Sequence, residues 1–430
     1  MTHRSVTPDN TVFIVISFEG PDSYSLAGGL GVRVDKMTQA LAQEGYETHH
    51  IFIGDPFKSG ISTSCSGRLI QHRWCQWISQ YHPHGVYDGE EGKLNDFNQS
   101  LPEYLVEAIA RPHIEMNKRL VILAEEWHTA EAICQVSELL TERGLKEGNL
   151  LLWNANNTYS FSRINWSKLN RNVVITTVSR YMRQLMLPYG VEPLVIPNGI
   201  HPDLFQPVET CCCDILRDQF RADIVLFKMA RFDPAKGWIK AVETAACLKR
   251  LGYSVRFVVR GGKESYGWHV LQRARSLGLA VQDVEINGNT PEGSIHRIIA
   301  AKDAHVVNIK SFIPHELSRI LFACSDAVLA DSAHEPFGLV GLEAMASGGL
   351  AFVGNTGEDY ARDSENAMVL ETSKPSEAAA SVLYLHQRRE LSQQIRENAR
   401  SKAREYIWNK IIKGTLQAKL QRLAWERLVA

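Results

Sequence analysis

Two glutamates eight positions apart, Glu335 and Glu343, give the sequence its most specific chemical signal. They stand in the stretch "AHEPFGLVGLEAMASGG" (333–349). A carboxylate accepts hydrogen bonds from two neighbouring hydroxyls, so the pair favours one glutamate that contacts a sugar and one that contacts a ribose. A helix is predicted over about 339–347, and its first N–H groups would face phosphate oxygens. These amides belong to Gly338, Leu339 and Val340.

Two cations in a second loop suit the same ligand. Arg231 and Lys236 lie five positions apart in "RFDPAKGW" (231–238), between a predicted strand and a predicted helix. Fixed positive charges at that place would stabilise the negative charge that develops on a departing diphosphate. The alternative is a surface ion pair between Arg231 and Asp233, and the sequence leaves both interpretations open.

A glycine-rich turn follows the first predicted strand. In "AGGLGVR" (27–33), Gly28 and Gly29 would let backbone N–H groups approach an anion, next to the positive end of the following helix. The same glycines also suit a tight strand-to-helix turn that binds nothing. Taken alone, this motif does not decide between the two.

Polar residues also end two strands of the first half. Glu126 and His128 lie in "AEEWHTAEA", and Asn156 and Asn157 lie in "WNANNTYSF". Strand ends of an open α/β sheet are where ligands bind, so these side chains are candidates for the second substrate or the transferred group. For a single buried histidine, a structural hydrogen bond is the alternative.

The predicted elements that position these residues form two similar α/β halves. A buried strand over 11–20, an amphipathic helix and a second strand begin the first half, and the same order restarts near residue 223. This pattern predicts two doubly wound domains, 1–205 and 206–405, joined by a linker over 201–213. Residues 58–100 lack a clear period and are expected to form a long irregular insertion.

Composition excludes several other classes of protein. The 430 residues are 44% hydrophobic and 22% charged with a net charge of −1, so nothing suggests nucleic-acid binding. No apolar run reaches the roughly 18–20 residues of a membrane span, and no signal peptide is visible. The basic tail, 388–430, has 11 Lys and Arg against 4 Asp and Glu, which allows at most peripheral membrane contact.

The eight cysteines show neither metal-ligand spacing nor a disulfide framework. We therefore expect a reduced, cytoplasmic protein. The consecutive Cys211, Cys212 and Cys213 are expected to be a surface or packing feature.

Six segments together carry a family resemblance over nearly the whole chain. In order they are "GGLG", "EEWHTA", "VSRYM", "IPNGI", "RFDPAKG" and "EPFGLVGLE". They resemble the retaining GT-B glycosyltransferases of the family-4 group, which are related to glycogen, starch and sucrose-type synthases. The resemblance implies the GT-B fold: two Rossmann-like domains that face a central cleft, with a C-terminal helix (406–430) that crosses back to the first domain.

The resemblance also implies roles for the donor-site residues. Arg231 and Lys236 would hold the diphosphate and stabilise the leaving nucleotide. Glu335 would contact the hydroxyls of the sugar, and Glu343 the ribose.

Within the first domain, Gly28 and Gly29 would close on the phosphates. Glu126 stands where relatives often carry an aspartate. Two departures from the family pattern are visible: Asn156 replaces a histidine that contacts the sugar, and Glu358 replaces the second of two glycines.

The implied function is retaining, metal-independent transfer of a hexose, with glucose expected, to a hydroxyl acceptor such as a small sugar or a saccharide. The donor would be a UDP-, ADP- or GDP-hexose, and no cofactor is expected. Two alternatives remain at this point: a nucleotide-sugar-binding protein that has lost transfer activity, and a nucleotide-sugar epimerase on the same scaffold.

Overall fold

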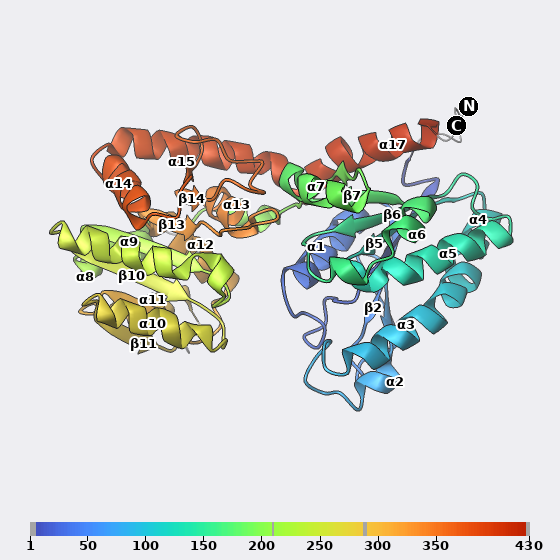
Figure 1. The fold of residues 1–430 in the computed structure, drawn as a ribbon, viewed down its shortest axis with the longest axis horizontal. Coiled ribbons are helices and arrows are strands. Elements are labelled where there is room, and N and C mark those ends of the chain that lie inside the picture. The colour runs from blue at the N-terminus through green and yellow to red at the C-terminus, as the bar shows by residue number, and fades with distance from the viewer. Residues whose placement is uncertain (1–5, 209, 287–289, 427–430) are drawn as a thin grey trace. The chain divides into compact units, whose positions relative to one another are not determined.

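The computed structural model describes residues 6–208, 210–286 and 290–426 (Figure 1). Two sheets built almost entirely of parallel strands organise the chain. Among the described residues, no helix is long and apolar enough to cross a membrane.

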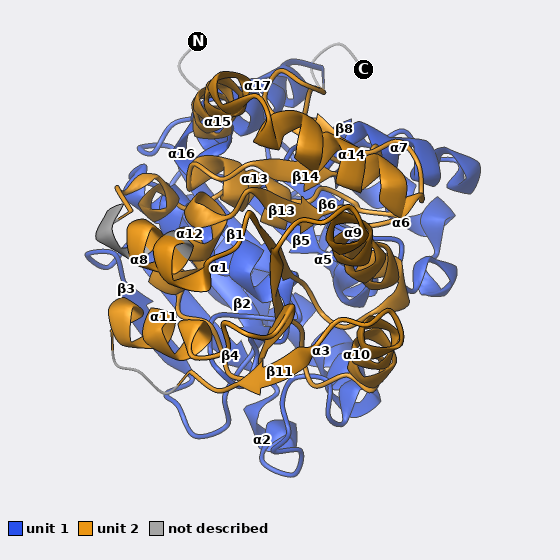
Figure 2. Ribbon diagram, turned by 90° about the vertical axis from the view of Figure 1, so that its left-hand side faces the viewer, with its two compact units in different colours: residues 1–199, 406–430 blue, residues 200–405 orange. Residues whose placement is uncertain are grey.

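The chain divides into two compact units (Figure 2): unit 1 is residues 1–199 with 406–430, and unit 2 is residues 200–405. The boundary lies between Gly199 and Ile200, whereas the sequence pattern places it after residue 205. The expected linker over 201–213 therefore lies within unit 2, where it contributes a 3-10 turn and the start of a helix.

Unit 1 contains an eight-stranded sheet in the order β3-β4-β2-β1-β5-β6-β7-β8. All neighbouring strands are parallel except β3, which pairs with β4 in the antiparallel sense. The central strands are continuous apolar runs because helices cover both faces of such a sheet. The strands are β1 (Thr11–Ile16), β2 (Glu47–Ile53), β3 (Ile61–Ser64), β4 (Leu69–Trp74), β5 (Arg119–Glu125), β6 (Leu150–Ala155), β7 (Val174–Thr177) and β8 (Leu194–Val195).

The first helix of unit 1 buries the face that its sequence predicts. Val34, Met37 and Leu41, which recur at helical spacing, are all buried in the core of this unit. The helices that precede the boundary are α1 (Gly29–Gln43), α2 (Gln76–Ser79), α3 (Glu90–Tyr104), the π-helix η2 (Leu105–Ala110), α4 (Arg111–Glu115), α5 (Ala130–Glu142), α6 (Trp166–Asn172) and α7 (Arg180–Met186).

The end of the chain completes unit 1 (Figure 1). Trp408, Ile412 and Leu416 belong to the same buried cluster as the strand β1 and helix α1. The indole of Trp408 approaches Gly199 so closely that a Cβ there would lie 2.4 Å from its ring. The elements of this segment are α16 (Trp408–Lys410), the π-helix η9 (Ile411–Leu416) and α17 (Gln417–Glu426).

Residues 58–100 are more regular than expected. They hold the hairpin of β3 and β4, helix α2 and most of α3. The prediction of an irregular insertion was wrong because β3 is a largely exposed edge strand, so the apolar alternation that marks a buried strand is absent.

A buried lysine anchors this segment. The ammonium of Lys93 donates to the Tyr24 hydroxyl (2.6 Å) and to the carbonyl oxygens of Gly85 (3.0 Å), Val86 (3.2 Å) and Asp88 (2.6 Å). Its side chain is fully buried, and burial lowers its pKa to about 8. The four oxygens offset the cost of placing a cation there.

Unit 2 contains a seven-stranded sheet in the order β11-β12-β10-β9-β13-β14-β15, and all its neighbouring strands are parallel. Its first strand is buried almost throughout. The strands are β9 (Ile224–Met229), β10 (Val255–Arg260), β11 (Val281–Val284), β12 (Val306–Ile309), β13 (Ala327–Ala330), β14 (Ala351–Val353) and β15 (Met368–Val369).

Helices cover both faces of this second sheet. In Figure 2, α9 and α10 lie on one side of the strands, and α8, α11 and α12 on the other. Trp238, at the start of α9, is fully buried in the core. The helices are α8 (Thr210–Phe220), α9 (Trp238–Arg250), α10 (Tyr266–Ser276), α11 (Pro291–Ile299), α12 (His315–Cys324), α13 (Leu339–Ala346), α14 (Pro375–His386) and α15 (Arg389–Ala403).

A disulfide joins α8 to α12, contrary to the expectation of unpaired cysteines. Cys213 is bonded to Cys324, 111 positions away in the sequence. The cysteine spacing could not reveal this pair, because only the fold brings the two helices together. The expectation that Cys213 is merely a surface or packing feature was therefore wrong.

Candidate functional site

Lys236 and Glu335 meet in unit 2, at the carboxyl ends of β9 and β13. The Lys236 ammonium lies 2.7 Å from Glu335 Oε2, and the two side chains stay 24% and 19% exposed. The turn before α9 fixes the lysine: Gly237 adopts a left-handed conformation (φ 65°), and a Cβ there would lie 2.3 Å from the Asp331 carbonyl oxygen. A partly accessible lysine–glutamate pair thus stands where open α/β sheets bind ligands.

Arg231 belongs to the same loop, and its residue is exposed. Its carbonyl oxygen accepts a hydrogen bond from the Trp238 indole at 2.7 Å, which orders the backbone. The Asp233 carboxylate accepts from the Ala235 N–H at 2.8 Å. No ion pair joins Arg231 to Asp233 within the described part of the chain, so the alternative interpretation of a mutually neutralised pair finds no support.

Helix α13 begins where the sequence predicts, directly after Gly338. This glycine is left-handed (φ 80°), and its carbonyl oxygen accepts the Tyr360 hydroxyl at 2.5 Å. Leu339 and Val340 are the first residues of the helix and are half-buried. Glu343 follows one turn later, half-buried, and burial raises the pKa of its carboxyl to about 7.

A loop after β14 holds the backbone of Glu335 in place. The Glu335 N–H donates to the Thr356 hydroxyl (3.0 Å), and the Gly357 N–H donates to the Glu335 carbonyl (2.9 Å). Glu358, the residue that departs from the family pattern, is 5% exposed, and its Oε2 accepts from the Thr356 N–H (3.0 Å). Its Oε1 is buried and has no hydrogen-bond partner among the described residues, and burial raises its pKa to about 7.

A second, buried lysine stands behind this site. Lys228 donates to the Leu329 carbonyl (2.7 Å) and lies 3.4 Å from Asp331 Oδ1. Lys240 contacts the other carboxylate oxygen of Asp331 at 3.1 Å. Sequence analysis missed all three residues, because Lys228 interrupts an apolar strand and Asp331 lies just past the next one.

The glycine-rich turn of unit 1 already holds an anion, which is a carboxylate of the chain itself. The N–H groups of Gly28 and Gly31 both donate to Glu19 Oε2 at 2.9 Å, and the Tyr87 hydroxyl donates to Glu19 Oε1 at 2.5 Å. Gly29 is exposed, with open space around its Cα. The N–H of Gly28 is thus used by a carboxylate of the chain itself, and the contact of Gly28 and Gly29 with donor phosphates stays a prediction.

Glu126 directly follows strand β5 in a left-handed conformation (φ 68°) that is unusual for a residue other than glycine. It is 4% exposed, and its Oε1 accepts from the Asn156 N–H at 2.6 Å. Burial raises its pKa to about 8. The structure therefore places Glu126 beneath the strand ends rather than on an accessible surface.

Sequence analysis missed the buried network beside Glu126. Glu125 forms a two-pronged pair with Arg33 (3.0 and 3.1 Å), and its Oε2 also accepts from the amides of Asn154 (3.0 Å) and Asn156 (2.8 Å). Arg33 also donates to Asn198. Both acidic residues at the end of this strand are buried, Glu125 at 1% and Glu126 at 4% exposure, and nothing in the local sequence indicates Arg33 as the partner of Glu125.

His128 lies in a buried aromatic pocket of unit 1. Its ring stacks on Phe18, with centroids 4.2 Å apart, and its Nε2 lies 2.7 Å from Glu90 Oε1. Burial lowers its pKa to about 3, so the ring is neutral. The side-chain oxygen of Asn157, Oδ1, accepts a hydrogen bond from the Tyr159 N–H at 2.7 Å.

A pocket opens beside His128. Trp127, Arg163 and Lys168 are among the residues that line it, and the Arg163 guanidinium lies over the Trp127 ring at 4.1 Å. Each cation already has a carboxylate partner: Arg163 Nη2 lies 2.9 Å from Glu91 Oε1, and Lys168 Nζ lies 2.7 Å from Glu131 Oε1.

The family model described as "Glycosyl transferases group 1" matches residues 217–402, within unit 2. A curated relative, D-inositol 3-phosphate glycosyltransferase of Geodermatophilus obscurus, is 25% identical over 245 residues. That match covers 55% of this chain and 49% of the relative, so it spans about half of the relative's length.

Solved structures match over nearly the whole chain. Sucrose-phosphate synthase from Thermosynechococcus elongatus has a TM-score of 0.66 at 17% identity and covers 96% of this chain and 99% of its own. The E. coli trehalose-6-phosphate protein bound with UDP-2-fluoro glucose scores 0.64 at 13% identity, covering 95% and 98%. Anabaena HepE in complex with UDP and glucose scores 0.60 at 15% identity, covering 95% and 100%. These likenesses establish the fold, two Rossmann-like domains of the GT-B type.

Proposed function

We propose that the chain is a retaining, metal-independent glycosyltransferase, because the family model for group 1 glycosyl transferases matches residues 217–402. It moves a hexose from a nucleotide-diphosphate sugar to a hydroxyl acceptor and uses no cofactor. The observation that carries the proposal is the partly exposed Lys236–Glu335 pair (2.7 Å), close in sequence to the exposed Arg231 and to the start of α13.

Each donor-site residue has a role that its chemistry supports. Lys236 and Arg231 neutralise the diphosphate as the bond to the sugar breaks. Glu335 accepts hydrogen bonds from sugar hydroxyls, and Glu343 accepts them from the ribose. The first amides of α13, at Leu339 and Val340, contact phosphate oxygens.

The transfer proceeds on one face of the sugar. As the bond to the diphosphate breaks, the anomeric carbon gains positive character and the leaving phosphate gains negative charge. That phosphate takes the proton of the acceptor hydroxyl, and the hydroxyl oxygen bonds to the same face of the sugar. Lys236 lowers the barrier by stabilising the leaving group, a type of contribution worth several kcal/mol in enzymes.

We propose UDP-glucose as the donor and a sugar phosphate as the acceptor. Two structural relatives bind UDP with glucose or a UDP-glucose analogue, and the names of others contain sucrose-phosphate and inositol 3-phosphate. In this chain, Arg163 and Lys168 line the pocket beside His128, and a phosphate group would bind there by taking the place of their carboxylate partners Glu91 and Glu131.

The test is Lys236→Ala, with Lys249→Ala as the matched control. Lys249 is a half-buried lysine at the end of α9, and its ammonium donates to the Gly278 carbonyl oxygen. UDP release from UDP-glucose is measured with and without a panel of sugar phosphates. We expect Lys236→Ala to lower turnover by about 10²-fold or more, and Lys249→Ala to leave it unchanged. Equal turnover in both variants, or tight UDP-glucose binding without any turnover in the wild type, contradicts the proposal.

A further inference from the structure

Three potential metal ligands converge in unit 1, two from one strand and the third from a helix more than 60 positions later. Glu47 and His49 lie two positions apart on β2, so their side chains share one face of the sheet. His113 reaches the same place from α4. Glu47 is the first residue of β2, so the cluster lies at the amino-terminal ends of the parallel strands. Glu125 and Glu126 lie at their opposite, carboxyl-terminal ends.

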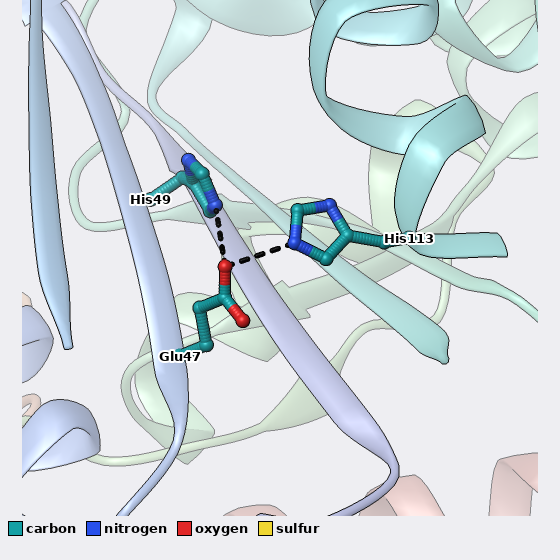
Figure 3. Close-up of side chains that lie close together, drawn as sticks. All are labelled: Glu47, His49 and His113. Carbon is teal, nitrogen blue, oxygen red and sulfur yellow. Dashed lines mark hydrogen bonds and ion pairs between the residues drawn. The ribbon is translucent and has the colours of Figure 1, made fainter. Parts of the chain in front are cut away.

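The ligand atoms have spacings that a metal ion can bridge. Both imidazoles turn toward the same carboxylate oxygen (Figure 3): His113 Nε2 lies 2.9 Å and His49 Nε2 lies 3.4 Å from Glu47 Oε1. One ligand atom from each residue lies within 4.8 Å of the others. Metal bonds of about 2.1 Å place tetrahedral ligand atoms about 3.4 Å apart, so only small side-chain adjustments are needed.

The hydrogen bond on the far side of His113 directs its free lone pair toward the cluster. Its Nδ1 lies 2.7 Å from the Ile109 carbonyl oxygen, which can only accept. Nδ1 therefore carries a proton, and a ring that holds only this proton presents the Nε2 lone pair to Glu47. Two acceptors 2.9 Å apart repel unless a proton or a cation stands between them.

His49 has the outer partners that are typical of a metal ligand. Its Nδ1 lies 3.0 Å from His72 Nε2, and His72 Nδ1 lies 3.2 Å from the Tyr104 hydroxyl. When His49 Nδ1–H donates to His72 Nε2 and His72 Nδ1–H donates to the Tyr104 hydroxyl, His49 Nε2 also presents a lone pair to the cluster. Such outer hydrogen bonds fix the orientation and tautomer of ligating histidines.

Local backbone geometry supplies the third ligand. The π-helix η2 interrupts the helical run between α3 and α4, and a π-turn changes the direction in which later side chains point. It contributes the Ile109 carbonyl that holds His113. π-turns occur frequently at functional sites.

We propose that Glu47, His49 and His113 bind Zn²⁺, with water as the fourth ligand. Two imidazoles and one carboxylate are a donor set that zinc accepts, and a site with three protein ligands keeps one open position. The Glu47 side chain is 43% exposed, which gives the ion and the water access. The ion would join β2 to α4 and thereby stabilise the folded state of unit 1. This role is structural and takes no part in sugar transfer.

The alternative occupant is a proton, which would make the cluster an ion pair between an imidazolium and Glu47. The experiment that separates the two is calorimetric titration of the full chain with Zn²⁺ after treatment with EDTA. Substitution of Co²⁺ then reports the ligands, because its visible absorption depends on coordination geometry. We expect one Zn²⁺ per chain and a rise of the thermal midpoint that EDTA reverses.

His113→Gln and Glu47→Gln test the ligands, with His82→Gln as the matched control. His82 also contacts a carboxylate in unit 1, at 3.3 Å from Asp88. We expect both ligand variants to weaken Zn²⁺ binding by about tenfold or more, and the control to bind as the wild type does. If His113→Gln fails to fold, Glu47→Gln decides, since its side chain is partly exposed.

Absence of stoichiometric Zn²⁺ binding, or unchanged affinity in Glu47→Gln, overturns the proposal. We expect Lys236→Ala to bind Zn²⁺ with the affinity of the wild type. Zinc binding and sugar transfer can therefore succeed or fail independently of each other.

Discussion

Replacing Gly357 with alanine would move the backbone of Glu335 without touching its carboxylate. A Cβ at position 357 would lie 2.2 Å from the Pro336 carbonyl oxygen and 2.3 Å from that of Glu335, where ordinary contact begins at 3.4 Å. Both obstacles are backbone atoms, so the segment 335–336 must move by about 1 Å. A displacement of that size costs about 10²-fold in rate, which lowers kcat/KM by the equivalent of about 2.7 kcal/mol.

The assay compares kcat/KM for UDP release in Gly357→Ala and in Gly414→Ala. Gly414 has no atom within 4 Å of an added Cβ, so its substitution controls for a glycine-to-alanine change as such. Circular dichroism and thermal unfolding establish that both variants are folded. A folded Gly357→Ala enzyme with the kcat/KM of the wild type would refute the reasoning, because the position of Glu335 would then not matter to transfer.

Three further perturbations test interactions that stabilise each unit away from the donor loops. Arg33→Met leaves the Glu125 carboxylate buried without its cation, so the free energy of unfolding measured in urea should fall by about 3–5 kcal/mol. The double variant Arg33→Met/Glu125→Met should recover part of that loss. Burial raises the pKa of Glu126 from 4.5 to about 8, so the native state binds one more proton than the unfolded state between these values. The free energy of unfolding should therefore fall as pH rises through this window, and Glu126→Gln should remove that part of the slope. Cys213→Ser removes the disulfide to Cys324 and should cost about 2–4 kcal/mol, and a reducing agent should destabilise the wild type but not the variant.

The sequence indicated the sheets and the donor loops because their signals are local. Buried parallel strands read as short apolar runs, and Gly338 marks the start of α13 because the preceding turn needs a left-handed residue. Lys236 and Glu335 were found for the same reason: each stands in a short polar stretch directly after a strand. Their 2.7 Å contact follows from two strands that lie side by side in the sheet.

The features that escaped prediction depend on distant parts of the chain. Glu19 occupies the amides of the glycine turn, and nothing in the turn itself indicates that carboxylate. Lys228 can be buried in an apolar strand because Asp331 and the Leu329 carbonyl oxygen contact its ammonium. Likewise His113 meets Glu47 across 66 positions, and no spacing rule covers such a pair.

The return of residues 406–430 to unit 1 has a consequence for biosynthesis. On the ribosome, residues 11–199 are made before Trp408, Ile412 and Leu416, so the apolar surface of unit 1 that these three side chains cover stays uncovered until they have been made. Unit 2 can close on itself earlier, since its residues are contiguous. Unit 1 can therefore complete its core only after all of unit 2 has been made, and until then nascent chains carry an uncovered apolar surface that chaperones would recognise.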